Sequence, residues 1–481
     1  MSSNPLRTFF YPESIAIIGA SRNPLKIGGI LTKNIIEGGY KGKVYLVNPS
    51  GESIFGFKAY KSILDVKDNV DLAIIVIPAK SVPIALRELG EKGIKAVVVI
   101  SSGFAEAGNE GRALQEEVVK IARQYGIRMI GPNSFGIVSS HINLNATFGV
   151  PLKTKGSIAV LSQSGAIADG ILDWFQDEGL AFSILVNLGN RGDVSESEIL
   201  EFLLEDENTE AIGIYLEGLP PGGGKKFMDT LSAVSRVKPV VILKAGKSTA
   251  GAKAALSHTG SLAGNYRVYE SAIRQRGGIF VEDMEGFMDT LRAYSGYIKR
   301  LKYSKIKCQH VSCSRSASTK KIAIISNSGG LGILASDEAE KIGLEVPTLP
   351  SNVVNDIRKI IPPFGNPYNP IDITAQGTPQ DQYSMYTKVF EVIEKAQLVD
   401  GYVLVIEGSY PPELMGVLKD AVVNDILQKT PKPVVVNWFA AKSAVASYIF
   451  EIEKSGIPVY PTPERAVRSI HKLLTHSVVL E

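Results

Sequence analysis

Short apolar runs rich in valine and isoleucine recur along the chain, and each ends in Gly, Ser, Asn or Pro before an amphipathic stretch begins. A continuous apolar run is typical of a strand buried on both faces of a parallel sheet, and an amphipathic stretch is typical of the helix that crosses over it. The alternation therefore predicts an α/β fold of doubly wound domains, whose ligands lie outside the carboxyl ends of the strands.

The apolar runs fall into three groups along the chain. The first comprises SIAIIGAS, KVYLVNP, LAIIVIP, AVVVISSG and RMIGPN, the second SIAVLSQSG, FSILVNLG, AIGIYLEG, VVILKAG and GIFVED, and the third KIAIISNSGGLG, DGYVLVIEG, VVVNW and IPVYPTPE. A polar, basic stretch without periodicity separates the second group from the third. We therefore expect domains at residues 1–147, 148–302 and 320–481, with a linker at 303–319.

Length and charge narrow the class of protein. The 481 residues suit three domains of roughly 150 residues each. The chain has 52 Lys and Arg against 49 Asp and Glu, a net charge of +3, without the concentrated basic face that a nucleic-acid partner requires. Pro12 and Glu13 interrupt the first apolar stretch, and no apolar run is long enough to cross a membrane. We expect a cytoplasmic protein with neither nucleic-acid nor membrane partners.

The two cysteines, Cys308 and Cys313, flank His310 within the expected linker. A closed zinc site needs four ligands, one more than this cluster offers. We therefore expect reduced thiols in a solvated linker and no metal site.

The first apolar run ends in a turn that suits a phosphate, because backbone amides at a helix start bind anions. Gly19 is in the place of the first glycine of a dinucleotide fingerprint, but Ala20 and Ser21 follow where the fingerprint continues, and no second glycine comes in register. The next run ends in Asn48 and Pro49, where an NAD site has an acid. These departures disfavour NAD and favour another phosphate-bearing ligand over the same strand ends, for which coenzyme A is suitable, with a purely structural turn as the alternative.

Other strand ends of the first domain face the same expected crevice. The residues that we assign to CoA binding there, beyond the first two turns, are Pro78, Ser101, Gly103 and Asn133.

His258 stands in a run of small residues, AALSHTGSLAG, whereas a core histidine is usually packed by bulkier apolar neighbours. An imidazole with an ordinary pKa near 6.5 has a free lone pair at neutral pH and can accept a phosphoryl group. Covalent capture of this kind divides one difficult transfer into two easier ones. The alternative is a structural histidine.

Two further strand ends of the second domain suit the same chemistry. Ser162, Gln163, Ser164 and Gly165 end one run and open a helix, and we expect them to bind phosphate; an ordinary helix cap is the alternative. Glu217 ends another run and can orient the ring of a catalytic histidine, or else be a solvated edge residue. Lys244 either neutralises a phosphate or is one more lysine at a strand end, and the polar loop GNRGDVSESE is expected to shape the rim.

Seven motifs in order, GASRNP, VNP, SSGF, GPNSFG, SQSGA, KAGKS and SHTGSLAG, resemble the alpha subunit of the nucleoside-diphosphate-forming acyl-CoA synthetases, a group similar to succinyl-CoA synthetase. The resemblance covers nearly the whole chain. It implies a Rossmann-like CoA-binding domain followed by two flavodoxin-like domains, and phosphorylation of His258 with Glu217 as its orienting acid. The implied reaction converts acyl-CoA, phosphate and ADP into free acid, CoA and ATP.

The resemblance also has departures and further implications. The chain has Ser134 where the family often has cysteine, and it shows no ATP-grasp segment. It therefore implies a separate ATP-grasp beta subunit that binds ADP or ATP with Mg²⁺, in an α2β2 heterotetramer by analogy. In the third domain, SNSGGLG and NPIDIT are implied to be structural or interfacial.

Two rival functions follow from the same residues. One is a non-catalytic, CoA-binding regulator of a partner protein, and the other is an NAD-dependent oxidoreductase. The missing fingerprint glycines and Asn48 weaken the oxidoreductase, and His258 weakens the regulator, because a sensor has no use for an imidazole in a loop of glycine and serine. Which carboxylic acid the enzyme prefers depends on scattered side chains that line the acyl pocket, and motifs do not identify it.

Overall fold

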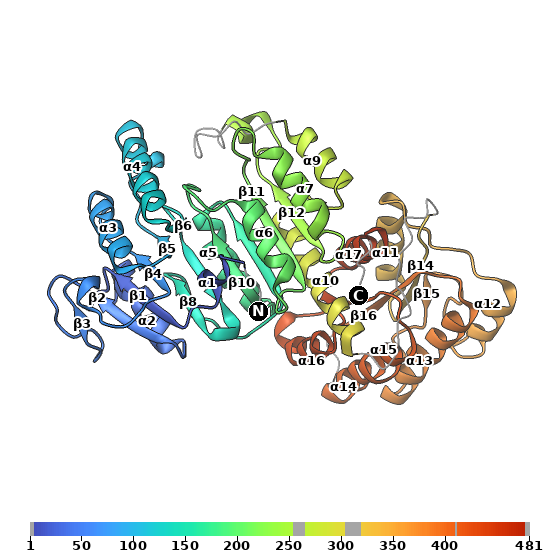
Figure 1. The fold of residues 1–481 in the computed structure, drawn as a ribbon. Helices are drawn as coiled ribbons and strands as arrows, with labels where there is room; N and C mark the ends of the chain where they lie inside the picture. The colour runs from blue at the N-terminus through green and yellow to red at the C-terminus, as the bar shows by residue number, and fades with distance from the viewer. Residues whose placement is uncertain (1–3, 254–264, 304–318, 409–410, 477–481) are drawn as a thin grey trace. The chain divides into compact units, whose positions relative to one another are not determined.

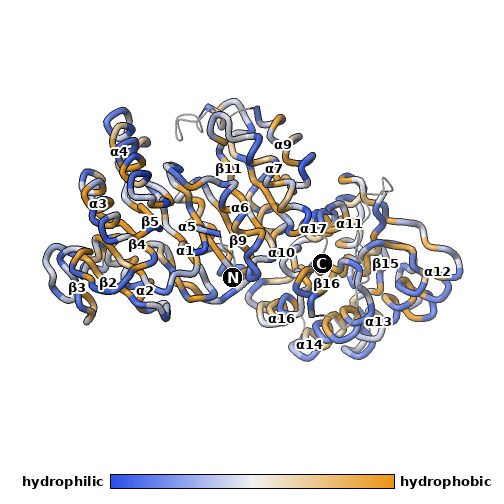
Figure 2. The backbone as a smooth tube through the Cα atoms, viewed as in Figure 1, coloured by the Kyte–Doolittle hydropathy of each residue, from blue (hydrophilic) through white to orange (hydrophobic). Residues whose placement is uncertain are grey.

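A computed structural model describes residues 4–253, 265–303, 319–408 and 411–476. The chain forms two compact units, residues 1–282 and residues 283–481. Each unit is built on parallel strands, and Figure 2 shows the apolar segments running along these strands. Figure 1 gives the labels of the elements.

The first sheet of the N-terminal unit has six parallel strands in the order β3-β2-β1-β4-β5-β6. This is the strand order of a dinucleotide-binding Rossmann fold. All five residues of β1 are buried, as a strand covered on both faces requires. The strands are β1 (Ser14–Ile18), β2 (Lys43–Val47), β3 (Ala59–Tyr60), β4 (Leu72–Ile75), β5 (Ala96–Val99) and β6 (Arg128–Ile130). The helices are α1 (Arg7–Phe10), α2 (Ile27–Glu37), α3 (Val82–Lys92) and α4 (Asn109–Tyr125).

The second sheet of this unit has the order β13-β12-β11-β9-β10-β7-β8. The strands from β13 to β10 are parallel, in the flavodoxin order, and β7 and β8 extend the sheet antiparallel. The strands are β7 (Gly136–Ser139), β8 (Leu144–Thr147), β9 (Ile158–Ser162), β10 (Phe182–Asn187), β11 (Ala211–Leu216), β12 (Val240–Lys244) and β13 (Ile279–Val281). The helices are α5 (Gly165–Asp177), α6 (Glu196–Glu205), α7 (Gly224–Val234) and α9 (Tyr266–Gln275).

Side chains join the two sheets of the N-terminal unit. Arg128, at the start of β6, donates to Asp193, between β10 and α6, at 2.8 Å and to Glu198 of α6 at 2.7 Å. Phe10 of α1 stacks on Phe202 of α6 with ring centroids 4.8 Å apart. These contacts hold the two sheets next to one another.

The C-terminal unit has one sheet of five parallel strands in the order β15-β14-β16-β17-β18, again the flavodoxin order. Its strands are β14 (Ile322–Ser326), β15 (Ile371–Asp372), β16 (Gly401–Glu407), β17 (Val434–Phe439) and β18 (Val459–Tyr460). Its helices are α10 (Met284–Tyr303), α11 (Gly329–Lys341), α12 (Ser351–Arg358), α13 (Pro379–Ala396), α14 (Pro412–Asp420), α15 (Leu427–Lys429), α16 (Lys442–Lys454) and α17 (Pro463–Thr475), with a π-helical segment at Ala421–Ile426 between α14 and α15.

The predicted fold class is confirmed: the protein is α/β, with one Rossmann-like and two flavodoxin-like sheets. Two details differ from the sequence-based expectation. The short strands β7 and β8 precede residue 148 but pair with the second sheet, and α10, which lies in the predicted range 148–302 except for its last residue, belongs to the C-terminal unit. In α10, Tyr294 donates to the carbonyl of Lys472 in α17 at 2.8 Å. The amphipathic pattern of α10 predicts a helix but cannot say which sheet it covers.

Most of the expected linker, with Cys308, His310 and Cys313, lies outside the described residues. Within the described part of the chain, no helix combines the length and the apolar character needed to cross a membrane.

Candidate functional site

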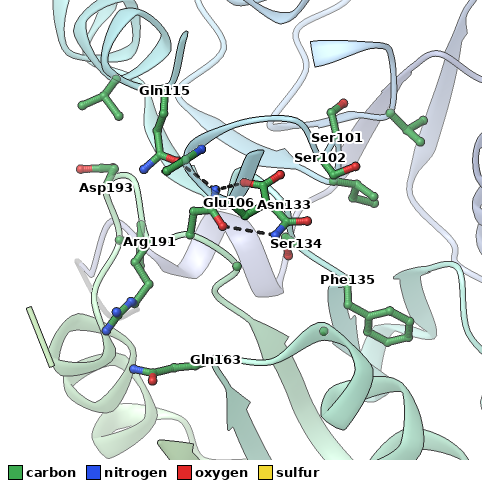
Figure 3. A pocket seen from close by; sticks show the side chains of 18 of the residues that line it. Ser101, Ser102, Glu106, Gln115, Asn133, Ser134, Phe135, Gln163, Arg191 and Asp193 are labelled. Carbon is green, nitrogen blue, oxygen red and sulfur yellow. Dashed lines mark hydrogen bonds between the residues drawn. The ribbon is translucent and has the colours of Figure 1, made fainter. Parts of the chain in front are cut away.

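A cavity of about 2290 Å³ opens between the strand ends of the two sheets in the N-terminal unit (Figure 3). Nine of the residues expected from the sequence line it: Gly19, Ser21, Pro78, Ser101, Asn133, Gln163, Ser164, Gly165 and Glu217. Ala20, Asn48, Pro49, Gly103 and Ser162 are not in its lining, and His258 lies outside the described residues. The structure therefore brings the expected CoA turn and the expected phosphate turn to one cavity.

Gly19 makes the turn after β1 with a φ of +101°, a conformation that favours glycine. A Cβ atom at Gly19 would lie 2.5 Å from the carbonyl oxygen of Val76, at the end of the neighbouring strand β4. A Cβ atom at Gly28 in α2 would lie 2.3 Å from the Gly19 oxygen. The turn is thus packed backbone to backbone between β4 and α2, which keeps the space above the strand ends open.

Asn48 supports this turn from the neighbouring strand. Its side-chain amide follows β2 and donates to the carbonyl of Ala20 at 2.8 Å, while its oxygen accepts from the backbone N–H of Ser50 at 2.9 Å. Asn48 and Ser21 also line a second cavity of about 460 Å³. The position that would carry the ribose-binding acid of an NAD site therefore holds an amide that positions the glycine turn.

Ser101 and Asn133 connect the ends of three neighbouring strands. Ser101 follows β5, and its hydroxyl accepts from the backbone N–H of Ile77 at 3.2 Å and donates to the Ile77 carbonyl at 2.5 Å. The backbone N–H of Asn133, which has a φ of +58°, donates to the Ser101 carbonyl at 2.9 Å. Both residues shape the rim by fixing its backbone.

A network that the sequence did not reveal crosses the cavity between the domains. Glu106 accepts from the backbone N–H of Gly103 at 2.5 Å and also from the side chain of Asn190, which donates to Gln115 at 2.9 Å (Figure 3). Burial acts to raise the pKa of Glu106, but these hydrogen bonds outweigh it and hold the pKa below its ordinary value. The only sequence signal was the polar loop that contains Asn190.

The turn after β9 presents the start of α5 to the cavity. The hydroxyl of Ser162 is buried and donates to the Ser164 carbonyl at 2.7 Å, and the Ser164 hydroxyl caps the helix by accepting from Ile167 N–H at 3.4 Å. Gly165 and Ala166, the first residues of the 13-residue helix, line the cavity. Backbone amides at such a helix start attract an anion.

The side chain of Gln163 turns away from this anion position and toward the protein. Its Oε1 atom accepts from the backbone N–H of Glu217 at 2.6 Å and of Gly218 at 3.0 Å. Its Nε2 atom donates to the Gly218 carbonyl at 2.9 Å and to Glu196. The structure thus shows Gln163 contacting the segment that holds the expected orienting acid.

Glu217 follows β11, the strand beside β9, and only 7 % of it is exposed. Lys244 ends β12 on the other side of β11 and donates to the Glu217 carbonyl at 2.8 Å. Burial lowers the pKa of Lys244 to about 8, and the charge of Glu217 offsets part of this shift. Glu217 therefore lies beside the point where the flavodoxin order reverses, between β11 and β9, which is where such folds bind ligands, and Lys244 holds its backbone from the next strand.

The C-terminal unit repeats this turn. Ser326 donates to the Ser328 carbonyl at 2.7 Å, as Ser162 does to Ser164, and Asn327 accepts from the backbone N–H of Glu407 at 2.8 Å. Glu407 ends β16, which lies beside β14 as β11 lies beside β9. The motif SNSGGLG is thus built like the phosphate turn, with a shorter amide side chain.

Comparisons with known families agree with this architecture. Residues 13–140 match the CoA binding domain family, residues 155–294 the succinyl-CoA ligase like flavodoxin domain, and residues 322–471 the ligase-CoA domain. The three matches follow the order of the three sheets.

Whole-chain relatives are also found. The chain is 39% identical over 477 residues to subunit alpha of the ADP-forming acetate–CoA ligase I of Pyrococcus furiosus, with 97% of each chain covered. It is 38% identical to an ADP-forming acetate–CoA ligase I of Archaeoglobus fulgidus, covering 98% of this chain and 64% of that protein. A solved structure of the dinucleotide-forming acetyl-coenzyme A synthetase 1 of Ca. Korarchaeum cryptofilum, in complex with phosphate and ADP, is 34% identical, with a TM-score of 0.85 over 98% of this chain and 97% of that one.

Proposed function

The chain belongs to the family of the ADP-forming acetate–CoA ligases, and on that premise we propose that it is the CoA-binding, phosphohistidine-carrying alpha subunit of an ADP-forming acyl-CoA ligase. The observation that carries the proposal is the shared cavity of the N-terminal unit. It brings the CoA turn at Gly19, the helix start at Gly165 and the acid Glu217 to one space.

The proposed reaction has three steps. Phosphate attacks the thioester carbonyl of acyl-CoA, the C–S bond breaks, and CoA thiolate and an acyl phosphate result. A ring nitrogen of His258 then attacks phosphorus and releases the free carboxylate. ADP finally takes the phosphoryl group from His258 and becomes ATP. Each step transfers one group without oxidation or reduction.

The residues of this chain have distinct roles in these three reaction steps. The backbone amides at Gly165 and Ala166 hold the phosphoryl oxygens, because they lie at the positive end of α5. Glu217 accepts the N–H of the other ring nitrogen, which fixes the tautomer and balances the positive charge of the phosphorylated ring. Ser162 and Gln163 keep the turn and the acid in place through their hydrogen bonds to the backbone.

The binding of CoA falls to the first sheet. The strand-end residues Gly19, Ser21, Pro78, Ser101 and Asn133 bound the CoA side of the cavity, while Asn48 positions the turn from outside it. A separate ATP-grasp beta subunit supplies most of the ADP site and its Mg²⁺, which neutralises charge on the phosphates. We propose an α2β2 complex in the cytoplasm.

The test is to purify this chain with its beta subunit and follow phosphate from labelled ATP. We expect an acid-labile, base-stable adduct that maps to His258, and none in His258→Ala. In a calorimeter, His258→Ala should bind CoA as the parent chain does, and neither should bind NAD. The alpha chain alone should make no acyl-CoA from acid, ATP and CoA. ATP formation at the normal rate by the His258→Ala complex would refute the proposal.

A further inference from the structure

The segment from Glu217 to Leu219 is held by four side chains, those of Gln163, Arg191, Lys244 and Tyr269. Gln163 binds the N–H of Glu217 and both backbone groups of Gly218. Lys244 binds the Glu217 carbonyl, and the hydroxyl of Tyr269 in α9 accepts from Leu219 N–H at 3.1 Å. These three residues beyond a strand end accept or donate more side-chain hydrogen bonds than a surface loop needs, because the backbone groups of most loops bind water.

Gln163 approaches this segment from β9. In the register of the parallel pair, Ser162 lies opposite Tyr215, which places the next residue, Gln163, level with Leu216, one residue before the segment. Only 7 % of Gln163 is exposed, and its amide nitrogen reaches the buried carboxylate of Glu196, to which Arg191 donates at 3.0 Å. Arg191 also donates to the Gly218 carbonyl at 2.7 Å. The amide is therefore fixed at both of its atoms.

Lys244 approaches from the opposite side, on β12, where it pairs with Leu216. Only 3 % of it is exposed, and its ammonium group lies 4.9 Å from the ring centroid of Tyr269. Its nitrogen donates to two backbone carbonyls, those of Glu217 at 2.8 Å and Ala245 at 2.5 Å. Burying a lysine costs free energy. A buried lysine that binds the Glu217 carbonyl therefore indicates that the position of the Glu217 backbone has to be exact to a fraction of an ångström.

We infer that Gln163 and Lys244 are positioning residues, which act on the reaction by holding Glu217 from its N–H side and from its C=O side. The inference rests on the proposed function, since it requires Glu217 to orient the reacting histidine. With either holder lost, the carboxylate shifts, and a misplacement of about 1 Å at a catalytic group can slow a reaction by about 100-fold. We expect Gln163→Met and Lys244→Met to slow phosphorylation about 10- to 100-fold, while CoA binding is unchanged.

A matched control separates positioning from ordinary stability. Gln176, near the end of α5, is another buried glutamine: its oxygen accepts from Lys153 N–H at 2.6 Å, and its nitrogen donates to the carbonyls of Leu172 at 2.9 Å and Pro151 at 3.3 Å. It does not line the cavity. Gln176→Met removes the same kind of amide from the same domain, so it should lower the melting temperature but leave the phosphorylation rate within about twofold.

The experiment measures the single-turnover phosphorylation of the histidine in the purified α–β complex, from labelled ATP, together with the CoA dissociation constant and the melting temperature. Each substitution is made in the parent chain and in Glu217→Ala. Gln163→Met and Lys244→Met should slow the parent but add no slowing to Glu217→Ala, because they act through that residue. Lys244→Arg, which keeps donors at this position, should recover part of the rate.

Two outcomes would overturn the inference while the proposed function stands: the parent rate in both Gln163→Met and Lys244→Met, or the same fold-loss in the Glu217→Ala background as in the parent. Absence of any phosphate from the parent complex would overturn the proposed function and the inference together. If Gln163→Met fails to fold, the Lys244→Met and Lys244→Arg pair decides by the same comparison.

Discussion

Replacing Gly19 by alanine should damage the first domain far more than the loss of one glycine ordinarily does. The position has a φ of +101°, which an L-residue adopts at a cost of roughly 1–2 kcal/mol. The added Cβ would also lie 2.5 Å from the Val76 oxygen and 2.9 Å from its carbonyl carbon. Both atoms belong to backbone beside the buried strand β4, so they cannot move aside as a flexible side chain would.

The loss of stability in Gly19→Ala is the sum of the cost of the backbone conformation and the cost of the close contacts. Overpacking of a tight site costs about 1–3 kcal/mol, so the sum with the backbone term is about 2–5 kcal/mol. Gly93 is the matched control, because it has a φ of +86° in the same domain and nothing within 4 Å of its added Cβ. Gly93→Ala should therefore cost only the backbone term, about 1–2 kcal/mol.

Hydrogen exchange on the full chain measures this difference, because it reports the free energy of opening segment by segment. Peptides that cover β1 and β4 should lose protection in Gly19→Ala, by at least about fivefold more than in Gly93→Ala. CoA binding measured by calorimetry should weaken in Gly19→Ala and stay unchanged in Gly93→Ala. Equal losses of protection in the two variants would refute the argument that backbone packing fixes this turn.

Three further substitutions test other parts of the molecule. Glu217→Gln should leave the melting temperature nearly unchanged but slow histidine phosphorylation about 10²–10³-fold. Phosphorylation as fast as in the parent complex would contradict the orienting role of Glu217. Burial lowers the pKa of Lys244 to about 8, below its value in the unfolded chain. The unfolded state therefore binds the extra proton between about pH 8 and 10.5, and this group makes stability rise with pH there. The melting temperature of Lys244→Met should not show this rise between about pH 8 and 10.5. Parallel curves of melting temperature against pH for the parent chain and Lys244→Met would contradict the lowered pKa of Lys244. Arg128→Ala removes the 2.8 Å contact with Asp193 and should cost about 1–3 kcal/mol in thermal unfolding, whereas a loss below about 0.5 kcal/mol would show that the contact does not join the sheets.

Sequence patterns predicted the sheets and the strand ends well, for a physical reason. In a parallel sheet all strands end at one edge, so residues that follow different strands meet without any knowledge of the tertiary packing. Gln163 and Glu217, which follow neighbouring strands of the second sheet, line one cavity on this ground, whereas Gly19 follows a strand of the first sheet and reaches the same cavity only through the packing of the two sheets. The short strands β7 and β8 escaped, because four-residue runs such as LNAT carry too little periodicity to be distinguished from loop.

Side-chain direction was the part that sequence could not supply. A polar residue after a strand suits a ligand and suits a neighbouring backbone equally, and Gln163 contacts the backbone. The bond between Asn190 and Glu106 joins residues 84 positions apart in two domains, so no local pattern contains it. Such contacts depend on how the sheets pack, which the hydrophobic pattern leaves open.

The repeated turn in the C-terminal unit explains why an amide stands at this position. Where the order of a flavodoxin sheet reverses, the helices after the two central strands leave on opposite faces, and the backbone just beyond the strands lacks a ladder partner. An amide side chain offers a donor and an acceptor together, and both Gln163 and Asn327 use them on the acid-containing segment beside them. The difference is reach: the nitrogen of Asn327 lies 3.5 Å from the Glu407 carbonyl, whereas the longer Gln163 reaches past its acid to bind both backbone groups of Gly218. An amide side chain thus binds the backbone beyond the central strands in both sheets. The additional hydrogen bonds of Gln163 occur in the N-terminal unit, where the acid Glu217 faces the shared cavity.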